Sequence, residues 1–210
     1  MDSIFNRFYS VLLSIYIYNE YVGYTELDKL HAAIINKYPQ ESEFIASVRK
    51  HADDEKKHYL MFKNYFHKNK SMPFVVTKNY GYIDLFIKHI FKTDLQTLDQ
   101  NELINDEKKF MNLCRLIMMT EFRGMKQVKT LLNSPLIKRN ESLTKIFKVV
   151  ERDEPSHCYP YQYWLKKFNS HEPRLKEKLV DLWIHYSLML FKVPILLLNG
   201  KLKRMKEFYV

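Results

Sequence analysis

The fold of this 210-residue chain is decided by two short stretches, Asp54-Glu-Lys-Lys-His58 and Asp153-Glu-Pro-Ser-His157. Each contains a glutamate and a histidine three residues apart, a spacing that places both side chains on one face of a helix. A second pair of stretches also matches, because Glu20-Tyr-Val-Gly23 resembles Glu121-Phe-Arg-Gly124. The glutamates are 35 residues apart in the first half of the chain and 33 apart in the second. A helix running out and a partner running back over that length bring both glutamates to one level, so each half predicts a helical hairpin.

Hydrophobic residues that recur every three or four positions extend these stretches into long helices. The chain has only four glycines and seven prolines and few alternating stretches, which argues against sandwiches, barrels and nucleotide-binding α/β folds. We therefore predict an all-α protein. The expected helices cover about residues 4–35, 41–69, 102–132 and 138–168, with a short helix over 82–91 and a C-terminal helix over 173–198.

The order of these helices predicts two antiparallel pairs with short links inside each pair. A crossover of about 30 residues, 71–100, connects the pairs, which differs from a simple up-and-down arrangement. With 46% hydrophobic residues the chain can bury one core, so we expect a single domain over 1–210. Within it, 4–168 form a four-helix bundle, 173–198 add a fifth helix and 199–210 form a basic tail.

One glutamate interrupts the apolar stripe of each long helix, at Glu20, Glu55, Glu121 and Glu154. An unpaired carboxylate in a packed interior costs several kcal/mol or takes up a proton, so four that converge require positive charge. The stripes offer no lysine or arginine at these levels. Two divalent metal ions would neutralise the four carboxylates, and His58 and His157 would complete the ligand set. Carboxylates combined with imidazoles suit iron or manganese.

These residues resemble the ligand pattern of the ferritin-like di-iron carboxylate superfamily, and the chain is similar in that pattern to rubrerythrin, bacterioferritin and the oxygenase-type di-iron proteins. The resemblance covers about residues 5–168. Three segments, Gly81–Asp84, Thr120–Met125 and Glu151–His157, also resemble bacterial proteins described as "ferritin-like domain" proteins. The resemblance implies two iron ions bridged by Glu55 and Glu154, with Glu20 and Glu121 as terminal carboxylates and His58 and His157 each capping one ion. Manganese, or one ion of each metal, would accept the same ligands.

The resemblance also implies roles for residues around the ligands. Asp54 and Asp153 would each hydrogen-bond a ligand histidine on the neighbouring helix. Tyr24 and Tyr161, one turn from ligands, are candidates for redox or proton-donating groups, although core packing is the commoner role of tyrosine. Gly23 and Gly124, one turn beyond two of the glutamates, would relieve crowding beside the metals.

Two features depart from the symmetric pattern or lie outside it. Pro155 lies inside the second Glu-x-x-His, so we expect the fourth helix to kink or unwind there, or to start anew near Asp153. The remaining histidines have no carboxylate at ligand spacing, and we expect ordinary surface or capping roles for them. They are His31, His51, His67, His89, His171 and His185.

Composition narrows the setting of the protein. Its two cysteines, Cys114 and Cys158, form no C-x-x-C pair, and the N-terminus does not resemble a signal peptide, so we expect a reducing cytoplasm. The net charge of +10 would suit nucleic acid, anionic lipid or acidic carrier proteins, but the lysines are spread over polar helix faces as on a solvated surface.

The segment 179–198 is apolar, yet charged residues and a proline interrupt it too often for a transmembrane span. We expect it to pack on the bundle or on a second subunit in a homodimer. Attachment to a membrane surface, helped by Lys201-Leu-Lys-Arg204, is the alternative.

The resemblance favours catalysis over iron storage, because two Glu-x-x-His motifs are typical of oxygen- and peroxide-reacting members. We expect a di-iron oxidoreductase that uses dioxygen and an external electron donor to oxidise or hydroxylate an organic substrate. A tRNA base would exploit the basic surface, and a lipid or acyl carrier the apolar C-terminal helix. The alternatives are a rubrerythrin-like peroxidase or ferroxidase and a metal-free helical interaction protein.

Overall fold

The computed structural model describes residues 4–209 and is all-helical, as the sequence predicts. The described residues contain no strand, only an isolated antiparallel bridge between Phe74 and Arg204. The long helices are α1 (Ile4–Lys37), α2 (Ser42–Lys68), α5 (Glu107–Asn133) and α7 (Glu141–Lys167). The shorter elements are η1 (Lys78–Tyr80), α3 (Tyr82–Phe91), η2 (Leu95–Thr97), α4 (Gln100–Asn105), α6 (Pro135–Lys138), α8 (Leu175–Tyr186), the π-helical η3 (Ser187–Lys192) and α9 (Val193–Leu198). The ends of the predicted domain, residues 1–3 and Val210, lie outside the described part of the chain.

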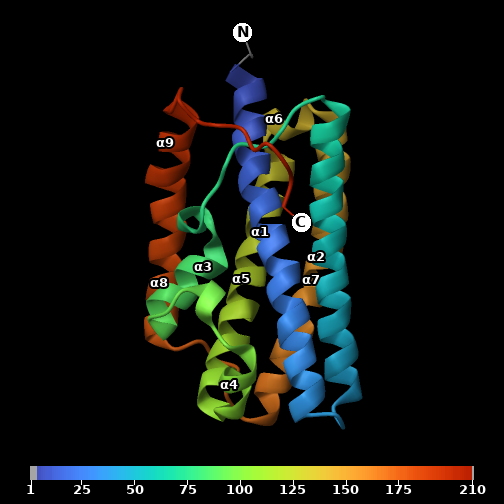
Figure 1. Ribbon diagram of the computed structural model, residues 1–210, viewed down its shortest axis with the longest axis vertical. Helices are drawn as coiled ribbons and strands as arrows, with labels where there is room; N and C mark the ends of the chain where they lie inside the picture. The colour runs from blue at the N-terminus through green and yellow to red at the C-terminus, as the bar shows by residue number, and fades with distance from the viewer. Residues whose placement is uncertain (1–3, 210) are drawn as a thin grey trace.

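The four long helices lie side by side along the long axis of the molecule (Figure 1). Helix α1 runs from one end to the other and α2 returns beside it, and α5 and α7 form a second antiparallel pair. Helix α2 packs against α7 and joins the two pairs. The connection from α2 to α5 runs back along the molecule and carries α3 and α4.

Two local predictions were wrong. The helix expected over 102–132 is split at Asp106, whose extended backbone (φ −96°, ψ 103°) ends α4 and whose side chain accepts a hydrogen bond from the backbone N–H of Lys109 to cap α5. Helix α7 is continuous through Pro155 and Pro160, so the expected unwinding or new start near Asp153 does not occur, while the expected kink stays a prediction. An interior proline costs about 3 kcal/mol, and the packing of α7 against both α5 and α2 offsets that cost.

Two apolar clusters fill the space between the long helices. One contains Phe44, Phe110 and Trp164, and the other contains Phe62 and Phe147. On each of the four long helices the inward-facing glutamate comes between residues of one cluster and residues of the other. The glutamates therefore form a polar layer at mid-length, with hydrophobic packing on both sides.

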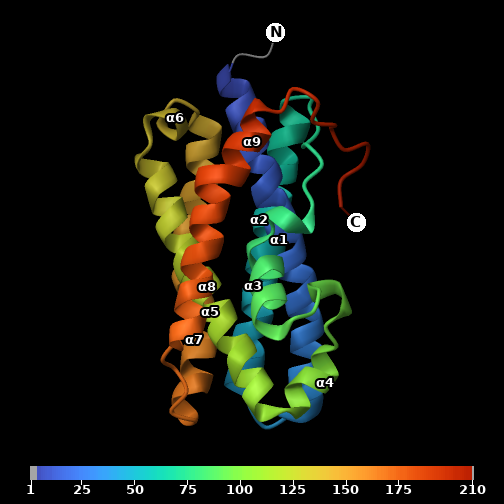
Figure 2. The same ribbon diagram turned by 90° about the vertical axis from the view of Figure 1, so that its left-hand side faces the viewer.

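The C-terminal helix, formed by α8, η3 and α9, runs along one side of the molecule next to α5 and α3 (Figure 2). The Arg115 guanidinium on α5 forms a buried ion pair with Glu177, with Nη2 3.0 Å from Oε1. Arg123 pairs with Asp181, whose carboxylate also accepts a hydrogen bond from Tyr82. By length and composition alone, the helix Leu175–Leu198 could cross a membrane. The charged residues and the proline within it therefore do not by themselves exclude a transmembrane helix, as we had expected them to.

Candidate metal centre

The first group of possible metal ligands joins α1 to α2. Glu20, Glu55 and His58 are all buried, and one ligand atom from each lies within 4.8 Å of the others. The Nδ1 atom of His58 is 3.4 Å from Oε2 of Glu20 and 4.0 Å from Oε1 of Glu55. The three side chains converge because residues 55 and 58 share one face of α2 and α1 packs on that face.

The second group joins α2 to the other hairpin. It consists of His51, Glu55, Glu121 and His157, again with ligand atoms within 4.8 Å of one another. The Nδ1 atom of His157 is 3.3 Å from Oε1 of Glu55 and 3.6 Å from Oε2 of Glu121. Glu55 belongs to both groups.

The fourth predicted carboxylate, Glu154, lies beside these groups. It is buried, and its Oε2 atom is 3.9 Å from Nδ1 of His157. All six predicted ligands are therefore brought together by the four long helices. We name these six residues together with His51 the Glu–His cluster.

An aspartate from the other hairpin lies at the outer nitrogen of each of two histidines. The Nε2 atom of His58 is hydrogen-bonded to Oδ2 of Asp153 at 3.2 Å, and Nε2 of His157 is 3.5 Å from Oδ2 of Asp54. The Lys57 ammonium lies between the two aspartates and pairs with both. With a proton on Nε2, each imidazole presents the lone pair of Nδ1 to the cluster.

His51 is the residue that the sequence interpretation missed, because we expected it at the surface or at a cap. It is 1% exposed, and its Nε2 atom is 3.5 Å from Oε1 of Glu121 and 3.7 Å from Oε1 of Glu55. Its ring stacks on that of His157, with centroids 4.2 Å apart. A signal was present, since residues 51, 55 and 58 are four and three apart and share one helix face.

The two tyrosines singled out from the sequence occupy different settings. Tyr161 is fully buried, and its hydroxyl lies 3.1 Å from Nδ1 of His51, which leaves Nε2 of that ring directed at the cluster. Tyr24 lies against Tyr21 and Tyr59 at ring distances of 5.5 and 5.7 Å, and within residues 4–209 no contact joins it to the Glu–His cluster. Tyr16 is the better placed tyrosine on α1, because its buried hydroxyl lies near Glu20 and Glu154. Burial and, after it, the negative charges of these two glutamates raise the pKa of Tyr16.

Six buried polar atoms of the Glu–His cluster find no hydrogen-bond partner among residues 4–209. They are Oε2 of Glu20, Nε2 of His51, Nδ1 of His58, Oε2 of Glu154, and both Nδ1 and Nε2 of His157. A buried polar atom without a partner costs about 1–3 kcal/mol, and native structures rarely gather several in one place. Nε2 of His157 lies 3.5 Å from Oδ2 of Asp54. The other five atoms are carboxylate oxygens or imidazole nitrogens, and a cation would satisfy them together. The donor set therefore fits a metal.

Burial raises the pKa values of three of the four glutamates in the Glu–His cluster. It raises the pKa of Glu20 to about 8 and raises the pKa values of Glu55 and Glu154 well above their usual range, with further increases from neighbouring carboxylates. Burial also opposes ionisation of Glu121, but His51 and His157 outweigh it and lower the pKa of that carboxyl. Without a cation, the cluster therefore favours protonated carboxyls over an array of four buried negative charges.

The pKa values of the three imidazoles also shift in opposite directions. Burial lowers the pKa of His51 to about 4 and also lowers the pKa of His58. For His157 burial acts in the same direction, but Asp54 and Glu121 outweigh it and raise its pKa. Neutral imidazole is the form that binds metals, and two of the three rings are poised in that form at neutral pH.

Both glycines expected to relieve crowding lie against cluster carboxylates. A Cβ atom added at Gly23 would lie 2.8 Å from Oε2 of Glu55, which is closer than real Cβ contacts. At Gly124 the added atom would lie 3.4 Å from Oε2 of Glu154, an ordinary contact. The two helical hairpins are thus similar in sequence, but the glycine packs more closely on its carboxylate in the first hairpin than in the second.

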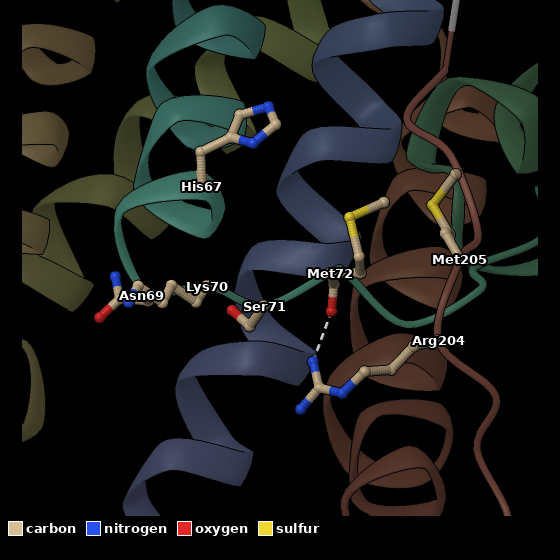
Figure 3. A pocket seen from close by; sticks show the side chains of 7 residues that line it. All are labelled: His67, Asn69, Lys70, Ser71, Met72, Arg204 and Met205. Carbon is tan, nitrogen blue, oxygen red and sulfur yellow. Dashed lines mark hydrogen bonds between the residues drawn. The ribbon is translucent and has the colours of Figure 1, made fainter.

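Two surface hollows lie away from the Glu–His cluster. The larger, of about 610 Å³, lies between the end of α2 and the C-terminal tail, where the Arg204 guanidinium donates to the Met72 carbonyl (Figure 3). It is lined by His67, Asn69, Lys70, Ser71, Met72, Arg204 and Met205. The smaller, of about 200 Å³, is lined by Met119, Phe122, Arg123, Lys126 and Asp181. No member of the cluster lines either hollow.

Comparison of the chain with protein-family models, curated proteins and solved structures yields no match. The class of the site therefore rests on its own geometry: a buried group of carboxylates and imidazoles, drawn from four helices, that could hold metal ions.

Proposed function

We propose that this protein is a ferritin-like di-iron carboxylate oxidoreductase that reduces dioxygen and oxidises an organic substrate. The convergence of five unpartnered buried ligand atoms is the observation that carries this proposal. The ferritin-like assignment is supported by two antiparallel helix pairs joined by a long crossover, with one glutamate contributed by each long helix.

The two groups of ligands suggest how the ions are shared. Glu20 and His58 would hold one ion, and His51, Glu121 and His157 would hold the other. Glu55 would contact both because it belongs to both groups. Glu154, beside His157, would supply a further carboxylate to the metal site. The third histidine makes one half of the set richer in nitrogen than the other.

Two bound iron ions would supply the electrons for reducing dioxygen. The chain's own residues would hold the ligands in place: Asp153 and Asp54 fix the orientation of His58 and His157, and Tyr161 fixes that of His51. The apolar clusters on both sides would exclude water from the polar layer. The buried hydroxyls of Tyr16 and Tyr161 are placed to donate or accept a proton near the ligands.

The test begins with metal content. Protein loaded anaerobically with ferrous iron should retain two ions per chain after desalting, and mixing it with dioxygen in a stopped-flow instrument should change its absorbance as oxygen is consumed. Glu55→Gln should abolish both effects, whereas Glu151→Gln, an exposed carboxylate on the same helix as Glu154, should abolish neither. Protein without stoichiometric metal, whose stability is unchanged in Glu55→Gln, would instead indicate a helical interaction protein.

A second candidate is a peroxidase or ferroxidase of the rubrerythrin type, which needs no organic substrate. The burial of the candidate ligands favours it, because Glu20, Glu55 and Glu154 are each less than 10% exposed and none of them lines either of the two hollows described above. Peroxide and ferrous ion are small enough to reach a closed site. Rapid turnover of hydrogen peroxide or ferrous ion, without any dioxygen-dependent oxidation of added organic compounds, would favour this candidate over an oxygenase.

A further inference from the structure

The C-terminal helix Leu175–Leu198 has one face on the protein and one face in solvent. Its inner face buries Ile184, Leu188 and Leu196. Its outer side carries large apolar residues that no other part of residues 4–209 covers, among them Leu179, Trp183, Tyr186, Leu190, Phe191 and Ile195. Trp183 and Leu190 are each 62% exposed, values far above those of core residues. We name this surface the outer apolar face.

The outer apolar face extends along most of the molecule. The helix occupies the edge farthest from α2 in Figure 1 and faces the viewer in Figure 2. A contiguous exposed apolar surface of this length is unusual for an isolated soluble protein and indicates an interaction surface. Trp and Tyr within it are the residue types that favour the boundary between a bilayer and water.

Charge on this helix has one sign wherever it meets solvent. Its only acidic residues, Glu177 and Asp181, are buried and paired with arginines of α5. Lys176 and Lys178 are exposed on the same helix, and Lys201 is exposed just beyond its end. An apolar face bordered by cations and without an exposed carboxylate is complementary to a negatively charged lipid surface.

Further cations gather where α3 meets the helix. The Lys192 ammonium donates to the Asn79 carbonyl at 2.7 Å. Burial and, after it, the nearby Lys88 ammonium lower the pKa of Lys192. These like charges would be relieved by an anionic headgroup, which adds to the electrostatic complementarity of this side of the molecule.

The helix is held so that it can lie on a bilayer but not cross one. Crossing would break the buried Arg115–Glu177 ion pair, whose guanidinium also donates to Ser170, and the Arg123–Asp181 pair. Leaving such a charge without its partner in a low-dielectric interior costs several kcal/mol. Contact with the outer apolar face alone leaves both pairs intact.

A second copy of the chain is a poorer match for this face. Two copies paired through it would bring their exposed lysines together, and the helix offers no exposed carboxylate to meet them. The net charge of +10 adds repulsion between copies. We propose that the outer apolar face binds an anionic lipid bilayer, with the helix parallel to the membrane surface and its aromatic side chains inserted at the headgroup level.

Sedimentation with lipid vesicles and tryptophan fluorescence test this binding. The protein should bind vesicles of phosphatidylcholine mixed with phosphatidylserine more tightly than vesicles of phosphatidylcholine alone, and high salt should weaken the difference. The emission should shift to the blue on binding, because Trp183 is exposed whereas Trp164 is 2% exposed. Trp183→Phe should abolish the shift but retain binding.

Matched variants locate the contact. Leu190→Glu should weaken binding about tenfold or more, because it places a negative charge in the inserted face, and Lys178→Gln about fivefold. Leu60→Glu, on the outer side of α2 and 44% exposed, should bind like the parent. Circular dichroism should show all three variants folded, since each residue is exposed.

Three results would overturn the proposal. The first is equal binding by Leu190→Glu and Leu60→Glu, and the second is binding that does not depend on anionic lipid. The third is a dimer in sedimentation equilibrium that Leu190→Glu dissociates, because the outer apolar face would then be covered by a second copy. None of these results bears on metal binding, so the two proposals fail independently.

Discussion

Gly23→Ala perturbs the Glu–His cluster by one methyl group. The added Cβ would lie 2.8 Å from Oε2 of Glu55, whereas ordinary contact begins at 3.4 Å, so the carboxylate must move by about 0.6 Å. Gly124→Ala is the matched control, because its Cβ would meet Oε2 of Glu154 at 3.4 Å without any movement. Both glycines are inside helices, α1 and α5.

The expected magnitude follows from how tightly a metal site must be held. Ligands displaced by more than about 0.5 Å no longer match productive geometry, and loss of ligand positioning typically lowers metal affinity about 10–100-fold. Gly23→Ala should therefore bind both ions about 10–100-fold more weakly than the parent, since Glu55 belongs to both ligand groups. Alanine is better than glycine inside a helix by about 1 kcal/mol, so neither variant should lose its fold.

Anaerobic titration with ferrous iron, and with cobalt as a coloured substitute, measures the affinities of both variants. Urea unfolding of the metal-free proteins checks that each is folded and should show Gly124→Ala to be slightly more stable than the parent. If Gly23→Ala bound metal as tightly as Gly124→Ala, the close approach of Gly23 to Glu55 would have no bearing on the site and the reasoning would be refuted.

Three further predictions concern other parts of the structure. Glu55→Gln should lose both ions, whereas Glu20→Gln should lose only one because it belongs to a single ligand group; metal analysis per chain decides, and retention of two ions by Glu55→Gln would contradict the assignment. Arg115→Met should lower the free energy of unfolding in urea by about 3–5 kcal/mol by leaving buried Glu177 unpaired, and adding Glu177→Leu should restore most of the loss. Burial raises the pKa of Asp84 to about 6 from 3.8, so its ionisation opposes folding as pH rises through that interval. Asp84→Asn should therefore gain stability relative to the parent by on the order of 2 kcal/mol between about pH 4 and pH 7, and a pH-independent difference would exclude this cause.

The helices were predictable because their causes are local. Apolar spacing placed the short helix over residues 82–91, where α3 lies. The split at Asp106 was missed because the helical periodicity of the sequence continues across it. Only the structure reveals the split, through the Asp106 side chain that caps α5 at the backbone N–H of Lys109. The continuity of α7 through Pro155 was missed for the opposite reason, since a local rule was overridden by packing against two neighbouring helices.

The sequence by itself determined which side of each long helix faces inward, and hence that four glutamates and two histidines meet in the interior. That follows because a helix repeats its environment every three or four residues, so a polar residue on an apolar stripe must be buried. The partners of those residues were decided only by the tertiary structure, because periodicity does not specify which helix covers a given face or how far each is rotated. His51 and Tyr161 meet across α2 and α7, Tyr24 packs against Tyr21 and Tyr59, and Glu55 alone belongs to both ligand groups. For the same reason, the sequence showed an apolar C-terminal helix, but only the packing of α8 on α3 shows which of its faces lies open to solvent.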